Sequence, residues 1–297
     1  MKRMKLFKGV GVALITPFDG KGNIDEKSLR NLVEYNIKNG VDFLTILGTT
    51  AETATMSCDE QNHVVKIIAN QCKKRVKLLI GIGGNNTKAV IEQIKTSSCL
   101  DKCDAILSVT PFYNKPSQQG LYEHFKAIAK NSPLPIVLYN VPGRTGVNMQ
   151  ASTTIRLASE IKNIIGLKEA SGLFQQATEL QKIDREDFSI LSGEDALILP
   201  LMSIGFNGVI SVAAQVCPKG FKEMIKAIKQ NDYKTARTLH LKYSELCKIL
   251  FAEGNPAGIK AALKSAGIIE FNTLRLPLTP VSESLYSKIN IEIQNLL

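Results

Sequence analysis

The stretch IIGLKEASG (residues 164–172) decides the fold of this chain, because it is a short apolar run that stops at a charged residue. A run of four or five apolar residues followed by a polar, glycine-containing turn predicts a buried strand of a parallel sheet. Lys168 ends the run, and strand alternation turns the next side chain, Glu169, to the opposite face. Burial favours the neutral amine of a lysine, which can add to a ketone to form a Schiff base. A structural lysine paired with a carboxylate fits this segment equally well.

Seven further runs of this type occur along the chain, and amphipathic helical stretches separate most of them. The eight predicted strands are Val10–Ile15, Phe43–Leu47, Val76–Ile82, Ala105–Val109, Ile136–Asn140, Ile164–Lys168, Ser189–Leu191 and Gly208–Val212. Helices with apolar residues three and four apart are predicted over Glu26–Asn39, Asp59–Lys73, Thr87–Ser98, Gln119–Asn131 and Ser152–Ile161. Eight strand–helix units in about 220 residues predict an α/β fold, a (β/α)8 TIM barrel, rather than a doubly wound sheet.

The last part of the chain differs from the rest because it shows helical periodicity and no clear strand. Residues 221–297 read as helices that break near Asn255-Pro256 and at the proline-rich loop Leu276–Pro280. The sequence therefore predicts two parts, a catalytic barrel over residues 1–225 and a C-terminal helical domain over residues 226–297.

The composition argues against several classes of protein. The formal charge of +10 arises from lysines and arginines spread along the chain, which favours attraction of small acidic metabolites over a nucleic-acid site. The apolar run near the N-terminus is too short to span a membrane and lacks the cleavage site of a secretory signal. Six dispersed cysteines then indicate a reducing compartment, so we expect a cytoplasmic protein with free thiols and no membrane segment.

Polar and aromatic residues follow several predicted strands, where a barrel collects its functional groups. The turn Gly48–Glu52 can hold a carboxylate through its amides and hydroxyls, although a plain loop explains it as well. Tyr113 lies in a loop stiffened by two prolines, which suits a subunit contact or a hydroxyl supplied to a neighbouring site. Tyr139 ends one strand, and Arg144 follows in a tight turn that either aims its guanidinium at a carboxylate or leaves it solvated. The polar segment Ser192–Asp195 follows the seventh strand.

An amine, a phenol and two anion-binding elements at one end of a barrel predict imine chemistry on a 2-oxo acid. The motif Gly81–Asn86 begins like a dinucleotide-binding loop but lacks the last glycine and its acidic partner. The cysteines and the three histidines do not show the spacing of a four-ligand metal site. We therefore expect no metal and no organic cofactor, because the lysine itself supplies the electron sink.

Taken in order, these motifs resemble the dihydrodipicolinate synthase family of pyruvate-dependent class I aldolases, which also contains N-acetylneuraminate lyase. The resemblance covers nearly the whole chain through Ala13–Pro17, Gly48–Glu52, Val109–Pro116, Tyr139–Gly146, Gly166–Gly172, Gly208–Val212 and Leu274–Pro280. Each motif is moderately specific, and their common order and spacing make the set highly specific. The resemblance implies a lyase that condenses pyruvate with L-aspartate 4-semialdehyde, the first committed step of diaminopimelate and lysine biosynthesis.

The resemblance also implies roles for single residues. Lys168 would form the imine with pyruvate, and Tyr139 would shuttle protons as the imine becomes an enamine. Thr50 and Tyr113 would complete that proton relay, with Tyr113 reaching into the site of a partner subunit. A homotetramer built from two such dimers is therefore expected.

Substrate contacts follow from the same resemblance. Thr49 and Thr50 would hold the carboxylate of pyruvate, and the backbone carbonyl of Ile210 would line the pocket. Arg144 would receive the carboxylate of aspartate semialdehyde at the entrance. Sialic acid lyases usually lack this arginine and carry serine in place of Thr49, so the synthase is favoured over N-acetylneuraminate lyase. A catalytically silent barrel used for binding is the third hypothesis.

Two departures from the family pattern bear on the site and its regulation. Ala51 replaces a glycine in the turn Gly48–Glu52, which is tolerable only if that position does not need a positive φ. In lysine-inhibited relatives an effector site at the dimer interface uses histidine and glutamate side chains beside an asparagine and a tyrosine, of which the asparagine remains here as Asn85. The aligned positions here are Cys58, Gln61, Ala89 and Phe112. Without the glutamate the effector's amine has no charged partner, so we expect inhibition by lysine to be weak or absent.

Overall fold

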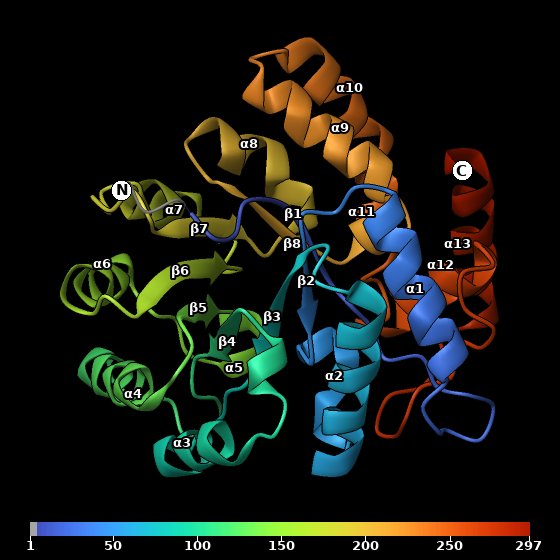
Figure 1. Ribbon diagram of the computed structural model, residues 1–297. Helices are drawn as coiled ribbons and strands as arrows, with labels where there is room; N and C mark the ends of the chain where they lie inside the picture. Colours follow the sequence, from blue (N-terminus) through green and yellow to red (C-terminus); the bar gives the residue numbers. More distant parts are fainter. Residues whose placement is uncertain (1–4) are drawn as a thin grey trace.

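Eight parallel strands form a closed barrel in the computed structural model, which describes residues 5–297 (Figure 1). The strands are β1 (Gly9–Ala13), β2 (Phe43–Ile46), β3 (Lys77–Gly81), β4 (Ala105–Val109), β5 (Ile136–Asn140), β6 (Ile164–Glu169), β7 (Ser189–Ser192) and β8 (Gly208–Ser211). Each strand pairs with its neighbours in chain order, and β1 pairs with β8 to close the barrel. The predicted TIM barrel is confirmed, with every strand within one or two residues of its predicted bounds.

Helices surround the barrel, because an apolar helix face can cover the outside of a parallel sheet. They are α1 (Glu26–Lys38), α2 (Cys58–Cys72), α3 (Thr87–Thr96), α4 (Gln118–Asn131), α5 (Pro142–Thr145), α6 (Ala151–Glu160), α7 (Phe174–Leu180), α8 (Ile198–Ser203) and α9 (Pro218–Lys229). The side chains of Asp25 and Ser57 accept backbone N–H bonds where α1 and α2 begin. All five helices predicted between the strands are confirmed.

The barrel is packed on both faces of its sheet. A small cluster of buried apolar residues fills the interior, and a larger one lies between the strands and the helices. The interior cluster includes Phe43, Leu107, Tyr139 and Ile210, which come from β2, β4, β5 and β8. Alternate side chains of a strand face opposite ways, so the strands contribute to both clusters. The interior packing gives way to a cavity at the carboxyl ends of the strands, where a barrel places its site.

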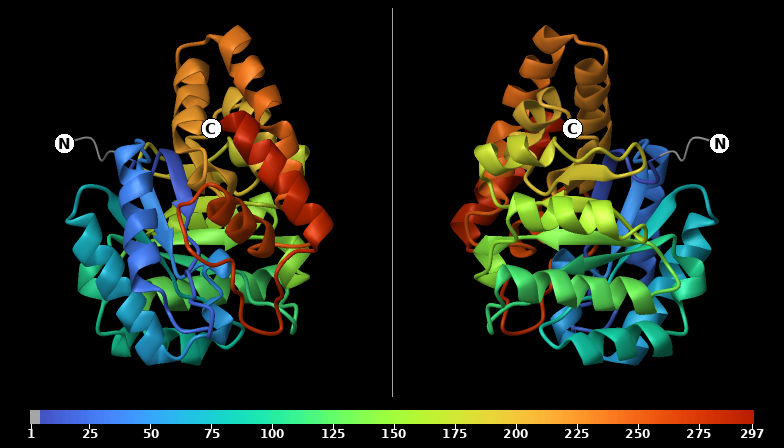
Figure 2. Two further views of the ribbon diagram at one scale, coloured as in Figure 1. Left: turned by 90° about the vertical axis from the view of Figure 1, so that its right-hand side faces the viewer. Right: turned by 90° about the vertical axis from the view of Figure 1, so that its left-hand side faces the viewer.

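Four further helices follow α9, as the helical periodicity predicts: α10 (Tyr233–Lys242), α11 (Ser244–Ile249), α12 (Ala257–Ser265) and α13 (Glu283–Leu296). Figure 1 shows α11, α12 and α13 gathered on one side of the barrel. The predicted boundary after residue 225 falls inside α9, which contacts β1 and α10. The segment between α12 and α13 runs down along the barrel (Figure 2). It brings residues near position 275 to the barrel mouth, where they contact the turn after β2.

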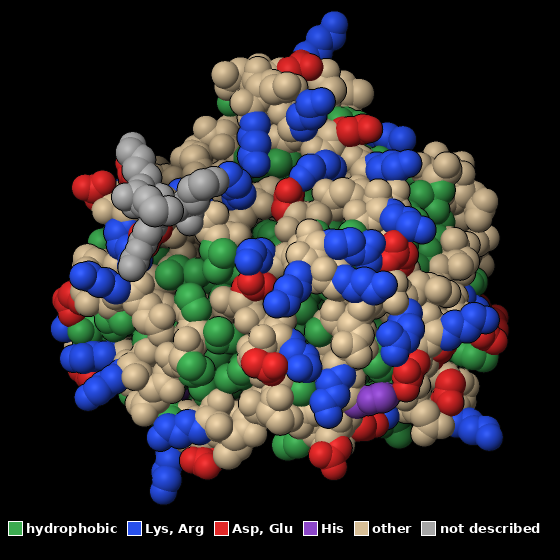
Figure 3. Space-filling model, in the orientation of Figure 1, with side chains coloured by type: hydrophobic (Ala, Val, Ile, Leu, Met, Phe, Trp, Pro, Cys, Tyr) green, Lys and Arg blue, Asp and Glu red, His purple; other side chains and the backbone are tan. Residues whose placement is uncertain are grey.

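The surface shows no single basic patch on the face drawn in Figure 3, where lysine and arginine side chains are scattered among acidic ones. All six cysteines are unpaired, and of these Cys58 alone is exposed. Within residues 5–297, no helix is both long enough and apolar enough to cross a bilayer.

Candidate active site

Lys168 lies near the carboxyl end of β6, and its side chain is 6% exposed. Its Nζ is 4.2 Å from the centroid of the Tyr139 ring on β5. The register of the parallel pair explains this contact, because Tyr139 and Lys168 are direct partners across β5 and β6. The two residues predicted as nucleophile and proton shuttle are therefore neighbours on the inner face of the barrel.

A cavity of about 60 Å³ adjoins the Lys168 side chain. Its lining includes Thr49, Thr50, Tyr139, Arg144 and Lys168, which come from the ends of β2, β5 and β6 and the loops that follow. Five of the predicted site residues are thus brought together from segments more than 100 positions apart in sequence. We call this space the inner cavity.

A second cavity, of about 570 Å³, lies next to the inner one and shares Thr49, Tyr139 and Arg144 with it. We call it the outer cavity, and its lining extends to Phe112 and to Leu278 in the segment before α13. A reactant can therefore pass from a wide vestibule to a narrow space beside the amine. A third cavity, of about 700 Å³, lies between the end of α2 and the starts of β3 and β4, and it contains no predicted site residue.

The turn after β2 forms a short 3-10 helix, η1 (Thr49–Ala51), at the barrel mouth. The Thr50 hydroxyl is buried and accepts a hydrogen bond of 2.9 Å from Asn255 Nδ2. The positive φ of this turn, 56°, falls on Glu52, and Ala51 lies outside the left-handed region. The β-carbon of Ala51 therefore introduces no backbone strain, and the condition set for this departure from the family pattern is met.

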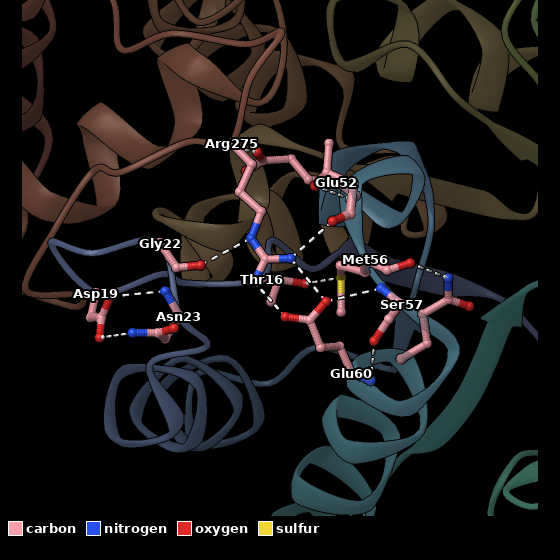
Figure 4. A network of polar contacts seen from close by, with 11 residues as sticks. Thr16, Asp19, Gly22, Asn23, Glu52, Met56, Ser57, Glu60 and Arg275 are labelled. Carbon is pink, nitrogen blue, oxygen red and sulfur yellow. Dashed lines mark hydrogen bonds and ion pairs between the residues drawn. The ribbon is translucent and has the colours of Figure 1, made fainter.

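Behind this turn, a polar network around Arg275 ties Glu52 and Glu60 to the C-terminal segment (Figure 4), and a buried ion pair lies beside it. Glu52 Oε1 lies 2.5 Å from Lys260 Nζ, with both side chains fully buried, in a contact that is an ion pair without hydrogen-bond alignment. Burial lowers the pKa of Lys260 to about 8, and the carboxylate of Glu52 opposes that shift. The backbone N–H of Arg275 donates to Glu52, and its guanidinium binds Glu60. The Thr49–Thr50 turn is thus held from outside the barrel.

Glu169 is also buried, and its carboxylate turns away from the inner cavity, as strand alternation requires. It accepts hydrogen bonds from Asn140 Nδ2 (3.1 Å), Gln176 Nε2 (3.2 Å) and the Ser171 backbone (2.7 Å). Burial raises the pKa of Glu169, while these donors act in the opposite direction. Glu169 therefore anchors the end of β6. Lys168 forms no ion pair with a carboxylate in residues 5–297, so the structure does not support the alternative of a structural lysine.

Two adjacent carboxylates after β7 have different surroundings. Asp195 is buried and accepts backbone N–H bonds from Val212 (3.0 Å) and Ala213 (2.8 Å). Glu194 lines the inner cavity instead. Burial and the neighbouring Asp195 raise the pKa of Glu194, whereas Lys168 and Arg144 act to lower it. These acidic residues do not form a metal site: no group of three or more His, Cys, Asp or Glu side chains in residues 5–297 could hold a metal ion.

The other predicted residues occupy three kinds of position. Arg144 lies on α5, is exposed, and makes no side-chain hydrogen bond or ion pair with any residue that the structure describes, so its guanidinium is available to an anion. Tyr113 is 89% exposed with a φ of 70° and lies outside the lining of both cavities. Ile210 is packed inside the barrel, and Val212 of the same segment lines the inner cavity.

Three polar residues that line the inner cavity were not predicted as site residues from the sequence. The buried Thr45 hydroxyl has no hydrogen-bond partner among residues 5–297, and its only sequence signal is one polar residue inside an apolar strand. Asn255 reaches Thr50 across 205 positions of sequence, and nothing near it in the chain announces that contact. Glu194 stands in a noted polar segment, Ser192–Asp195, but the sequence does not show which of the two carboxylates in that segment lines the cavity.

Known proteins are similar to this chain over nearly its whole length. The model of the dihydrodipicolinate synthetase family matches residues 6–296. A protein of Parabacteroides distasonis named 4-hydroxy-tetrahydrodipicolinate synthase is 47% identical over 289 residues, which is 97% of each chain. One of the same name from Azobacteroides pseudotrichonymphae is 49% identical over 287 residues, 97% of this chain and 96% of its own.

Solved structures agree with these sequence relatives. The chloride-inhibited dihydrodipicolinate synthase of Acinetobacter baumannii, solved in complex with pyruvate, superposes with a TM-score of 0.92 at 39% identity. The match covers 98% of this chain and 99% of that one. Both the barrel and the C-terminal helices are therefore shared with that protein.

Proposed function

The chain belongs to the dihydrodipicolinate synthetase family, and we propose that it condenses pyruvate with L-aspartate 4-semialdehyde, the reaction of 4-hydroxy-tetrahydrodipicolinate synthases. It is a lyase-type enzyme of the class I aldolase kind. One observation carries the proposal: the amine of Lys168 is buried against Tyr139 beside a cavity of about 60 Å³, with Arg144 at the edge. So small a cavity suits a molecule of a few heavy atoms, such as pyruvate.

In the first half-reaction, Lys168 attacks the keto carbon of pyruvate, and loss of water leaves an imine on its Nζ. The Thr49–Thr50 turn faces the same cavity and can take the carboxylate of pyruvate through its hydroxyls and amides. Tyr139 pairs with Lys168 across the two strands and its ring lies 4.2 Å from Nζ, so its phenol would serve the conversion of imine to enamine. The carbonyl of Ile210 would border the same space.

In the second half-reaction, the enamine carbon attacks the aldehyde of aspartate semialdehyde, which enters through the outer cavity. Arg144 borders both cavities, and its unpaired guanidinium suits the carboxylate of this second reactant. The amine of the substrate then attacks the imine carbon and displaces Lys168, which closes the ring and restores the enzyme. No metal or organic cofactor enters these steps, because the protonated imine is itself the electron sink.

The proposed proton relay extends beyond one chain. The Thr50 hydroxyl is bonded to Asn255 here, and Tyr113 projects from the surface of the chain, where a second copy would receive it. This placement supports a working dimer in which Tyr113 enters the partner's site, and two such dimers would form the homotetramer. The six free cysteines favour a reducing compartment, the cytoplasm.

The imine on Lys168 is tested by adding borohydride to the protein with pyruvate, followed by peptide mass spectrometry. We expect the peptide that contains Lys168 to gain the mass of the reduced pyruvate adduct. A Lys168→Met variant and a sample without pyruvate serve as controls. An unmodified Lys168 peptide would refute the imine mechanism and favour the hypothesis of a catalytically silent barrel used for binding.

The identity of the second reactant is tested by a coupled assay that follows pyruvate consumption with aspartate semialdehyde, run beside an assay of N-acetylneuraminate cleavage. Turnover with aspartate semialdehyde is expected, because Arg144 provides a site for a second carboxylate. Cleavage of N-acetylneuraminate without condensation would make the chain a sialic acid lyase instead.

A further inference from the structure

The second reactant of the proposed function has two charged groups, and the residues assigned so far can bind only one of them. Aspartate semialdehyde has an aldehyde, a carboxylate and an α-ammonium group, and Arg144 can pair only with the carboxylate. A buried or half-buried ammonium group needs an anionic or hydrogen-bonding partner of its own. The inner cavity must therefore offer an acceptor that the catalytic steps above do not use.

Glu194 is the carboxylate that lines the inner cavity. Its backbone N–H donates to Ser192 Oγ (3.0 Å), and the same hydroxyl donates to its carbonyl (2.9 Å), so the position of the residue is fixed. Its side-chain oxygens, in contrast, have no hydrogen-bond donor and no ion-pair partner within 4.0 Å among the residues that the structure describes. The adjacent Asp195 does not line this cavity: its Oδ2 accepts from the backbone N–H groups of Val212 and Ala213, and its Oδ1 is buried without a hydrogen-bond partner among residues 5–297.

The charges around Glu194 favour a zwitterionic ligand. Lys168 and Arg144 both lie close enough to act electrostatically on its carboxylate, but neither forms an ion pair with it. Arg144 and Glu194 thus present an unpaired cation and an unpaired anion to one cavity. A molecule with a carboxylate and an ammonium group on the same carbon can pair with both.

We infer that Glu194 binds the α-ammonium group of the second reactant and makes the site selective for an amino aldehyde acid. This inference rests on the proposed function. Glu194 would then be a specificity-determining residue, while Arg144 anchors the opposite end of the same group. The competing role is that of counter-ion to the Lys168 amine, which would act on the pyruvate step and would not distinguish between aldehydes.

The test compares two aldehydes that differ only in the amine: aspartate semialdehyde and succinate semialdehyde. In the Glu194→Gln variant, we expect the KM for aspartate semialdehyde to rise about 10- to 100-fold, as for loss of a charged hydrogen bond. The inhibition constant of succinate semialdehyde should change less than about twofold by the same reasoning, because it makes no contact with Glu194. Borohydride trapping of the pyruvate imine should give the wild-type yield.

Two further variants make the comparison specific. Glu194→Asp keeps the charge, and we expect it to recover part of the lost affinity for aspartate semialdehyde. Glu223→Gln removes one negative charge from the exposed face of α9 and should leave both aldehydes at their wild-type values.

Each other outcome overturns the inference in a recognisable way. Equal losses for both aldehydes would mean that Glu194 only shapes the cavity, and a reduced imine yield would make it the counter-ion of Lys168. Unchanged KM values would show that the ammonium group binds elsewhere. If the wild-type protein traps pyruvate but never consumes aspartate semialdehyde, the proposed function itself fails, and the inference fails with it.

Discussion

Gly193 leaves no room for a side chain beside the reactive lysine. A β-carbon built at this position would lie 2.6 Å from Ala170 Cβ and 3.0 Å from Lys168 Cε. Its backbone N–H also donates to the Glu169 carbonyl at 2.7 Å, so the strand end cannot move aside without losing that bond. Position 193 therefore requires glycine, because any side chain there would collide with Ala170 and with the Lys168 side chain itself.

We expect Gly193→Ala to lower the rate of imine formation at least about tenfold and to cost about 1–3 kcal/mol of unfolding free energy, the range for overpacked sites. Borohydride trapping with pyruvate and urea unfolding measure the two effects. Gly20→Ala is the control, since its β-carbon would meet only Phe271 at 3.7 Å. Wild-type trapping in Gly193→Ala would show that the Lys168 side chain can shift without loss.

At the scale of elements, the Glu52–Lys260 pair joins the turn after β2 to α12. Both side chains are fully buried, and removing one partner would leave the other as an unpaired buried charge. We expect Lys260→Met to reduce the free energy of unfolding by about 3–5 kcal/mol. Urea unfolding of Lys260→Met, Glu52→Gln and the double variant measures this. The double variant should lose less than the sum of the singles, and strict additivity would argue against a coupled pair.

The contact between α3 and α4 contains a histidine that should make stability depend on pH. His124 is buried, its Nδ1 lies 2.8 Å from Thr87 Oγ1, and burial lowers its pKa to about 4 from about 6.5. Between these values the unfolded chain binds a proton that the folded chain excludes. The contribution of His124 to the free energy of unfolding is therefore fully present above about pH 6.5. It falls as the pH drops towards 4, by up to about 3 kcal/mol.

Urea unfolding at pH 7 and pH 4.5 measures this effect. In His124→Gln the drop between the two pH values should be smaller than in the wild-type protein, because the unfolded variant has one fewer group to protonate there. A drop of the same size in both proteins would assign the pH dependence to other groups.

At the scale of the whole molecule, Tyr113 tests whether the chain works alone. It is 89% exposed in a single chain, yet the proposed relay requires it inside a partner's site. We expect Tyr113→Phe to lower kcat about 10- to 100-fold, the range for loss of a general acid–base group, while the pyruvate imine still forms. Turnover and sedimentation are measured on the same samples. Wild-type turnover in a dimeric variant would remove Tyr113 from the relay.

Regulation by lysine would also be a property of the assembly, since the family resemblance implies an effector site between two chains. Gln61 Nε2 donates to the carbonyls of Thr53 and Met56, so this side chain is engaged within its own chain. A cavity of about 80 Å³ is lined by Cys58 and Gln61 and includes no carboxylate in its lining. We expect activity titrated with L-lysine to show no half-inhibition below about 1 mM, given the cost of an unpaired ammonium group. Half-inhibition at submillimolar lysine would contradict this.

The sequence predicts most of the fold because strand and helix periodicities are local. The apolar runs that contain Tyr139 and Lys168 each predict a strand from about five residues, and eight such strands alternating with helices predict a closed barrel. The domain boundary is harder to predict, since α9 belongs to the barrel by its contact with β1 and to the C-terminal part by its contact with α10. Helical periodicity is the same on both sides of residue 225.

The site divides in the same way between local pattern and tertiary contact. The sequence by itself determined which strands end in reactive groups, because a barrel gathers the carboxyl ends of its strands whatever the loops do. Only the tertiary structure decided that Asn255 occupies the Thr50 hydroxyl and that Lys260 holds Glu52. It also decided that Asp195 Oδ2 accepts two backbone N–H bonds while Glu194 faces the cavity with its charge unpaired. The partner of a polar group depends on which distant segment packs against it, and no local pattern in the sequence shows which segment that is.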